Sequence, residues 1–174
     1  PSEVGRSLVA TMIHSVDVML VREITRRCDY DPDQLVKINR WVNECRGGTS
    51  RSREEDKMVM RLADLHRESG FLSARVLEYV DPANMGHIEP GALLSLVQSL
   101  PSKPFQVLSV HDCFRVLPNY GNDLRRQYNQ LLAEVYRSDL LSFLVSQIVK
   151  RRITVSKIDP DMFGDILESN YSLS

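Results

Sequence analysis

The sequence has few cysteines, almost no net charge and no long apolar run, and each shortage excludes a class of protein. The three cysteines, Cys28, Cys45 and Cys113, are an odd number without metal-ligand spacing, which favours a reducing compartment over a disulfide framework. The formal net charge of -1 provides no global field that would attract nucleic acid, although a local basic patch is compatible with it. No apolar run is as long as a membrane span, so we expect no membrane partner.

The composition is that of a globular protein with a real core, because 43% of the 174 residues are hydrophobic and 26% are charged. Apolar residues recur every three or four positions over residues 2–27, which predicts a long amphipathic helix with Ser2 as its N-cap. Asp31 and Pro32 predict the start of a second helix, and Gly47-Gly48 predicts its end.

The rest of the chain combines helices with one predicted hairpin. Further helices are expected over residues 49–70, 71–80, 91–100 and 122–152, the last as one helix or two, with a short tail after them. Residues 106–110 and 114–117 are short segments rich in Val, Leu and Phe between two prolines, so we expect a β-hairpin there. The predicted fold class is α+β, mainly helical.

This hairpin would place His111, Asp112 and Cys113 at or near its turn, between apolar neighbours that read as buried strands. One carboxylate on a rigid hairpin is a good ligand for Mg²⁺, which takes few protein ligands and keeps several waters. Paired metal ions of this kind hold both oxygens of a phosphoryl transfer. The alternative is that Asp112 only caps a tight turn.

A second motif, "HSVD", places His14 and Asp17 three residues apart on one face of the first helix. Its neighbours are apolar, so the alternative for His14 is a hydrogen-bonded histidine in the core or in an interface.

The stretch "DPANMGHIEPGA", residues 81–92, imitates a calcium-binding EF-hand loop without its ligands. Its third, fifth and twelfth places are Ala83, Met85 and Ala92, where oxygen donors are required. We therefore expect a turn between helices rather than a calcium site.

Basic residues cluster in three places, and each cluster could contact phosphate, although arginine-rich helix ends are common. The clusters are Arg22 with Arg26 and Arg27, Arg51 with Arg53, and Lys150 with Arg151 and Arg152.

Three stretches together resemble the C-terminal end of the single-subunit DNA-dependent RNA polymerases of phages and mitochondria. "SVHDCF" resembles motif C of that family, "HSVD" resembles the His-Ser-x-Asp at the start of a long palm helix, and "DILESNYSLS" resembles the end of the chain. With this resemblance the chain divides into a palm helix (1–29), an inserted helical subdomain (30–104), and the motif C hairpin with the following helices and C-terminal tail (105–174).

The resemblance implies that Asp112 is one of two catalytic aspartates that bind Mg²⁺, and that His111 shapes the active site around the RNA 3′ end. The second aspartate would lie outside this chain. The implied reaction is nucleotidyl transfer, in which the RNA 3′-hydroxyl attacks the α-phosphate of an NTP and pyrophosphate leaves.

The other site residues also follow from the resemblance. His14 and Asp17 would line the palm near the newest base pairs of the hybrid. Tyr171 would pack the tail in place, and Ser174 would lie close to the active site.

The implied partners are a DNA template, the nascent RNA, NTPs and the remaining polymerase chain or subunit, because one catalytic aspartate and the NTP-binding helix are missing here. We therefore expect a fragment or a subunit of a split polymerase, from a phage acting in the bacterial cytoplasm or alternatively from the mitochondrial matrix. The alternative function is a non-catalytic helical interaction or regulatory module with a degenerate EF-hand-like helix pair, in which His111 and Asp112 are turn residues.

Overall fold

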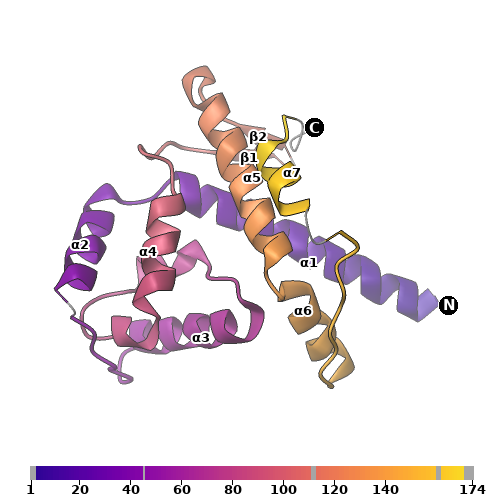
Figure 1. The fold of residues 1–174 in the computed structure, drawn as a ribbon, viewed down its shortest axis with the longest axis horizontal. Coiled ribbons are helices and arrows are strands. Elements are labelled where there is room, and N and C mark those ends of the chain that lie inside the picture. The colour runs from indigo at the N-terminus through magenta and orange to yellow at the C-terminus, as the bar shows by residue number, and fades with distance from the viewer. Residues whose placement is uncertain (1–2, 45, 111–112, 160–161, 171–174) are drawn as a thin grey trace.

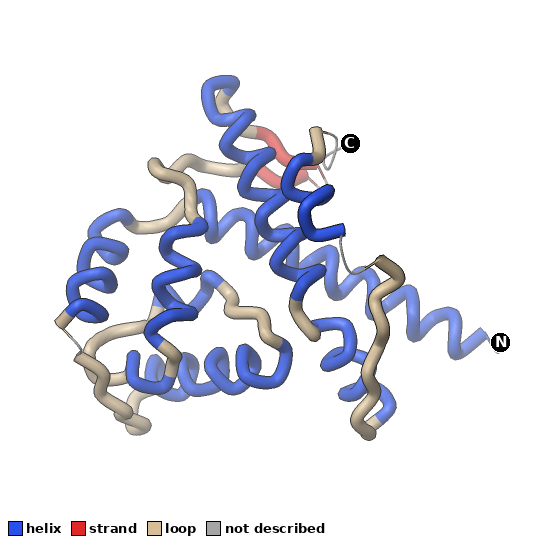
Figure 2. The backbone as a smooth tube through the Cα atoms, viewed as in Figure 1, coloured by secondary structure: helices blue, strands red, loops and turns tan. Residues whose placement is uncertain are grey.

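The computed structural model describes residues 3–44, 46–110, 113–159 and 162–170, and these form a mainly helical chain with one small antiparallel sheet (Figures 1 and 2). This confirms the predicted α+β, mainly helical class. The α-helices are α1 (Glu3–Cys28), α2 (Pro32–Asn43), α3 (Glu54–Ser69), α4 (Pro90–Ser99), α5 (Gly121–Arg137), α6 (Leu140–Val149) and α7 (Met162–Glu168). The strands are β1 (Leu108–Val110) and β2 (Cys113–Arg115), and the short 3-10 helices are η1 (Ala74–Glu78), η2 (Met85–His87) and η3 (Pro118–Tyr120).

Helices α2, α3 and α4 gather on one side of the molecule around a hydrophobic cluster (Figure 1). Its buried members all lie between Ile38 and Leu96, and Ile38 and Val59 are fully buried. Local signals in the sequence set these helices: Asp31 accepts a hydrogen bond from the backbone of Asp33 and caps α2, and Gly70 ends α3 with a φ of 71°. Such a φ favours glycine because it lacks a Cβ.

A second cluster joins α1, α5 and the segment that enters the hairpin. It contains Leu20 and Ile24 of α1, Leu124 and Leu131 of α5, and other buried side chains including Phe105. The backbone N–H of Phe105 donates to the carbonyl of Cys28 at 2.7 Å, so the end of α1 holds the chain where it approaches β1.

A buried ionic network also connects α1 with α5. Arg27 donates to Glu23 at 3.2 Å and to Glu134 at 2.5 Å, and the Arg27 side chain is fully buried. Glu23 in turn accepts from the Ser73 hydroxyl at 2.6 Å and from the Ala74 backbone at 2.5 Å. Arg27 therefore links α1 to α5, and Glu23 links α1 to η1 and to the residue before it.

Two loops cross where the EF-hand-like stretch was recognised. The backbone N–H of Gly86 donates to the carbonyl of Gly48 at 2.9 Å, and that of Gly48 donates to Pro82 at 2.8 Å. A Cβ on Gly48 would come within 2.6 Å of the Ala83 carbonyl oxygen, so this approach requires glycine. Gly47 and Gly48 thus serve the loop crossing, and α2 already ends at Asn43.

The tail carries one short helix, α7, which packs along α5. Three expectations from the sequence were wrong. Gly47-Gly48 does not end α2, which stops at Asn43. Residues 71–80 form no α-helix, and only η1 within them is helical. The strands are not buried: Leu108 and Val110 are 67% and 51% exposed. Ser2, the predicted first cap, lies outside the described residues.

Within the described residues, no helix combines the length and the apolarity that crossing a membrane requires.

Candidate functional site

The predicted hairpin is present, and its register is set by three residue pairs. Leu108 faces Arg115, Ser109 faces Phe114, and Val110 faces Cys113 in the antiparallel ladder. The two residues that separate the strands in the sequence are His111 and Asp112, the predicted catalytic pair. Both lie outside the described residues.

Aromatic side chains attach the hairpin to α5 and to the segment before it. The ring of Phe114 in β2 packs against Tyr128 of α5, with the centroids 5.7 Å apart and the rings tilted by 53°. Phe105, which precedes the hairpin, stacks on Tyr120, which follows it, with the ring centroids 4.7 Å apart. Such pairs stabilise by more than their buried area alone, so the hairpin has a defined position against α5.

The "HSVD" motif lies on the exposed surface of α1 beside the same helix. His14 and Asp17 are both exposed, so the alternative of a core histidine does not hold for His14. Burial raises the pKa of Tyr128, and the negative charge of Asp17 raises it further. Val16, which precedes Asp17 in the motif, packs against the same hydrophobic cluster as Tyr128 and Phe114.

The beginning of the C-terminal stretch is also held by α5. The side-chain amide of Asn129 donates to the carbonyl of Ser169 at 2.7 Å and to that of Leu167 at 3.3 Å. Arg125 donates to the Oδ1 atom of Asn170 at 2.8 Å. Tyr171 and Ser174, which the resemblance placed near the active site, lie outside the described residues.

One face of α5 therefore brings the three motif-bearing segments together. Arg125, Tyr128 and Asn129 have the i, i+3, i+4 spacing that places side chains on one helical face. No motif in the sequence marks these three residues, and their spacing is the one local signal that predicts a shared face. Tyr128 contacts the hairpin, and the charge of Asp17 contributes to raising its pKa. Arg125 and Asn129 donate hydrogen bonds to the residues before the chain end.

The sequence-predicted metal ligand, Asp112, is not among the residues that the structure describes. Within the described ranges, no three side chains of His, Cys, Asp or Glu gather as a metal site would require. In the EF-hand-like loop, Arg53 donates to both carboxylate oxygens of Asp81, at 2.8 and 3.1 Å. This pairing lowers the pKa of Asp81 and occupies the oxygens that a cation would need.

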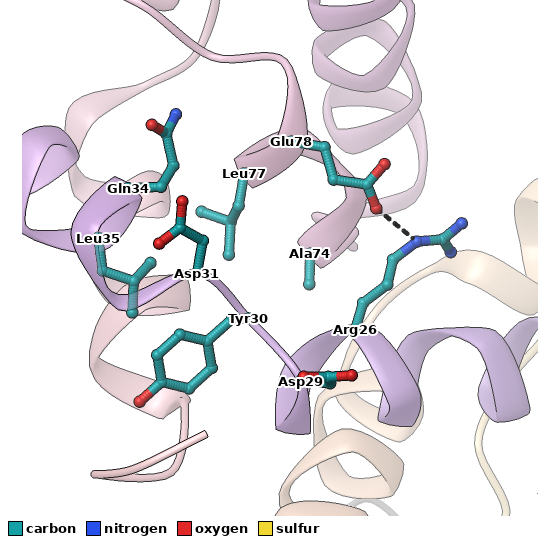
Figure 3. Close-up of a pocket in the computed structure, with 9 residues that line it drawn as sticks. All are labelled: Arg26, Asp29, Tyr30, Asp31, Gln34, Leu35, Ala74, Leu77 and Glu78. Carbon is teal, nitrogen blue, oxygen red and sulfur yellow. Dashed lines mark hydrogen bonds and ion pairs between the residues drawn. The ribbon is translucent and has the colours of Figure 1, made fainter. Parts of the chain in front are cut away.

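A small cavity of about 260 Å³ lies where α1 meets α2 and η1 (Figure 3). Its ionisable walls are Asp29, Asp31, Glu78 and Arg26, and Figure 3 shows Arg26 reaching across to Glu78, 3.0 Å away. With its one cation paired, the cavity is acidic. It is therefore unsuited to the phosphates of an NTP.

The thiol of Cys28 is also unsuited to chemistry. Cys28 is fully buried in the cluster between α1 and α5, and this burial raises its pKa to about 12. A nucleophilic cysteine requires a thiolate near neutral pH and access to a substrate, and Cys28 has neither.

Comparison with known proteins does not extend the resemblance. No protein-family model matches this chain, and no curated protein matches it. The similarity of the three motifs to the polymerase family therefore remains a prediction from the residues themselves.

Proposed function

We propose that this chain is part of a DNA-directed RNA polymerase and supplies one Mg²⁺-binding aspartate, Asp112, for nucleotidyl transfer to an RNA 3′ end. The observation that carries this proposal is the meeting of three segments on one face of α5. The "HDCF" hairpin, the "HSVD" helix and the residues before the chain end are far apart in the sequence, yet Tyr128, Arg125 and Asn129 gather them. A polymerase palm requires this meeting, whereas a turn aspartate in an interaction module does not.

The donor chemistry of Asp112 suits the implied metal ion, because a carboxylate oxygen is the ligand that Mg²⁺ prefers. When bound, paired Mg²⁺ ions would stabilise the charge that develops on the transferred phosphoryl group. In this proposal Asp112 holds the metal, His111 shapes the surroundings of the 3′ end, and Tyr128 positions the hairpin that carries both. The second aspartate belongs to the remaining polymerase chain.

The exposed apolar surface of α1 supports the presence of such a further chain. Leu8, Val9, Ile13 and Val18 are each about half exposed, between 48% and 54%. At 100° per residue these four side chains point to different sides of the helix. Polar side chains such as Thr11 and Ser15 are exposed between them, and in Figure 1 the N-terminal end of α1 extends beyond the other elements, so a partner at this end would cover a mixed surface.

The hairpin supports the same partner. A two-stranded sheet is marginally stable alone and leaves both of its edges unpaired. In β1, Leu108 and Val110 are exposed together with those edges. A palm strand from the remaining polymerase would cover this apolar surface and complete the sheet, and the whole assembly would then carry DNA, RNA and NTP.

The test is RNA extension on a primed DNA template by the complete polymerase, with Asp112→Asn compared with wild type. Loss of a metal ligand removes charge stabilisation at the reacting phosphate, so Mg²⁺-dependent extension should fall by several orders of magnitude. The matched control is Asp64→Asn on the exposed surface of α3, which should extend normally. Thermal unfolding of both variants checks their folding.

Near-normal extension by Asp112→Asn would refute the proposal. His111 and Asp112 would then be turn residues, and the exposed apolar surfaces would belong to a helical interaction module.

A further inference from the structure

The three basic clusters of the sequence differ in how many of their side chains are paired with carboxylates. In the first, Arg27 is buried between Glu23 and Glu134 and Arg26 pairs with Glu78, while Arg22 is exposed. In the second, Arg53 pairs with Asp56 and Asp81, while Arg51 is exposed. In the third, Lys150, Arg151 and Arg152 are all exposed, and no carboxylate of the described residues pairs with them.

These three cations, which we name the basic turn, follow directly after α6. The chain reverses there and returns along the helix. The Ser146 hydroxyl accepts a hydrogen bond from the backbone of Ile153 at 2.9 Å, and the Ser142 hydroxyl accepts one from Val155 at 3.0 Å. Two side chains of α6 thus hold the returning segment, so the basic turn has a defined conformation.

The first residue of the basic turn is in a conformation that disfavours its side chain. Lys150 has a φ of 53° and a ψ of 31°, in the left-handed region, which favours glycine because a Cβ is strained there. Among the described residues it is the one non-glycine residue with a positive φ. Replacing Lys150 with glycine would therefore remove the charge and relieve the backbone at the same time.

The basic turn borders an open groove of about 900 Å³ between α3 and α6. Arg67 of α3 also lines the groove, paired with Asp64 of the same helix, and Phe143 of α6 adds a partly buried aromatic ring. The groove also has two carboxylates. Asp139 precedes α6, about 15 Å along that helix from the basic turn, and Glu68 lies at the end of α3.

We propose that the basic turn and this groove bind the phosphate backbone of single-stranded nucleic acid, at a site separate from the hairpin. Grooves that bind single strands combine cations that follow the backbone with aromatic rings on which bases stack. Arginine forks also match phosphate geometry. The choice of nucleic acid among polyanions rests on the proposed polymerase function. The C-terminal end of α6 lies at the opposite side of the molecule from the hairpin (Figure 1), so the site would hold a strand outside the active site.

A purely structural explanation makes a different prediction. Cations at a helix C-terminus interact favourably with the helix dipole. If the basic turn served only α6, removing its charges would lower the unfolding temperature and leave binding unchanged. The binding proposal predicts the reverse.

The test measures fluorescence anisotropy of a labelled oligothymidylate with the full chain over a range of salt concentrations. The variant carries Lys150→Gln, Arg151→Gln and Arg152→Gln. The control carries Lys37→Gln, Arg40→Gln and Lys103→Gln, which remove the same charge from exposed positions elsewhere. Loss of three phosphate contacts should reduce the slope of log K against log salt by about 2, and weaken binding on the order of a hundredfold in dilute salt. The control variant should retain both.

The single variant Lys150→Gly separates binding from folding. It should weaken oligothymidylate binding about fivefold in dilute salt, because one phosphate contact is lost. It should at the same time raise the unfolding temperature or leave it unchanged, because glycine relieves the left-handed conformation. A lower unfolding temperature together with unchanged binding would overturn the proposal.

Further outcomes would also overturn it. Equal loss of binding in the basic-turn variant and in the control would show that only total charge matters. Unchanged oligothymidylate binding by the basic-turn variant, with lost binding to vesicles that contain anionic lipid, would assign the turn to a membrane surface instead. Oligothymidylate binding by Asp112→Asn should equal that of wild type, so the extension assay and the binding assay can fail independently.

Discussion

Arg27 of α1 and Glu134 of α5 meet across 107 positions of sequence, with Nη2 of the arginine 2.5 Å from Oε2 of the glutamate. Burial of Arg27 works against its charge, but the hydrogen bond and the charge of Glu134, with a further contribution from Glu23, raise its pKa overall. The two helices that carry the "HSVD" motif and the hairpin contact are therefore joined by a charge pair inside the protein.

Replacing Glu134 with alanine should destabilise the fold, because Arg27 would remain buried with one partner fewer. Removing one member of a fully buried pair costs about 3–5 kcal/mol. Glu134 is 21% exposed and Glu23 still accepts from Arg27, so we expect a smaller loss, about 2 kcal/mol. Urea unfolding followed by circular dichroism measures it.

The matched control for this change is Glu78→Ala. Glu78 pairs with the neighbouring Arg26, but both side chains are exposed to solvent, at 47% and 30%. Exposed pairs contribute little, so this variant should lose less than about 1 kcal/mol. Equal losses in the two alanine variants would show that burial of Arg27 does not set the cost.

On the proposed polymerase function, Tyr128→Ala should reduce RNA extension about tenfold to a hundredfold. The ring of Tyr128 positions Phe114 and with it the hairpin, and small misplacements of reacting groups cost up to about a hundredfold in rate. The loss should fall on kcat, with the affinity for template unchanged. Tyr128→Phe keeps the ring and should retain most of the activity.

Two results would contradict this role of Tyr128. Normal extension by Tyr128→Ala would show that the hairpin is positioned by other contacts, and equal losses in the alanine and phenylalanine variants would assign the effect to the hydroxyl group. Thermal unfolding of each variant separates either result from a loss of folding.

Asp56 should make the protein sensitive to acid. Hydrogen bonds from Arg53, followed by those from Ser50, the Arg53 backbone and Asn84, hold the pKa of this carboxylate well below its ordinary value despite its desolvation. A depressed pKa in the folded state adds stability above the pKa of the unfolded chain, about 4, and this stability is lost as pH falls below that value.

Unfolding temperatures measured from pH 7 down to about pH 2 test this contribution. Wild type should lose stability below about pH 4, and Asp56→Asn should be less stable at neutral pH with a shallower acid loss. Asp64→Asn, on the exposed part of the same helix, should follow wild type. Parallel profiles for wild type and Asp56→Asn would contradict the role of Asp56.

The helices were predictable where a local signal marks a boundary. Asp31 caps α2 and Gly70 ends α3 as expected, since a capping carboxylate and a left-handed glycine act on their own turn of the chain. The hairpin was predictable from apolar segments between prolines. The exposure of the hairpin was not predictable. The sequence of an apolar strand is the same whether the segment that packs on it belongs to this chain or to another.

The candidate site was predictable only in part. The motifs that suggested His14, Asp17 and Asp112 are short stretches of sequence, whereas their meeting depends on Arg125, Tyr128 and Asn129 of a helix that no motif marks. The pairing of the basic residues could not be predicted from the sequence either. Arg27 pairs with a glutamate more than a hundred residues away, and Lys150 has no carboxylate partner among the described residues.

The mainly helical class, the start of α2, the end of α3 and the position of the hairpin follow from interactions among residues a few positions apart, and these are visible in the sequence. The pairing of charges, the exposure of apolar faces and the arrangement of the motifs around α5 depend on contacts between distant segments. Such contacts form only when the two hydrophobic clusters hold α1 and α5, and α2, α3 and α4, in place.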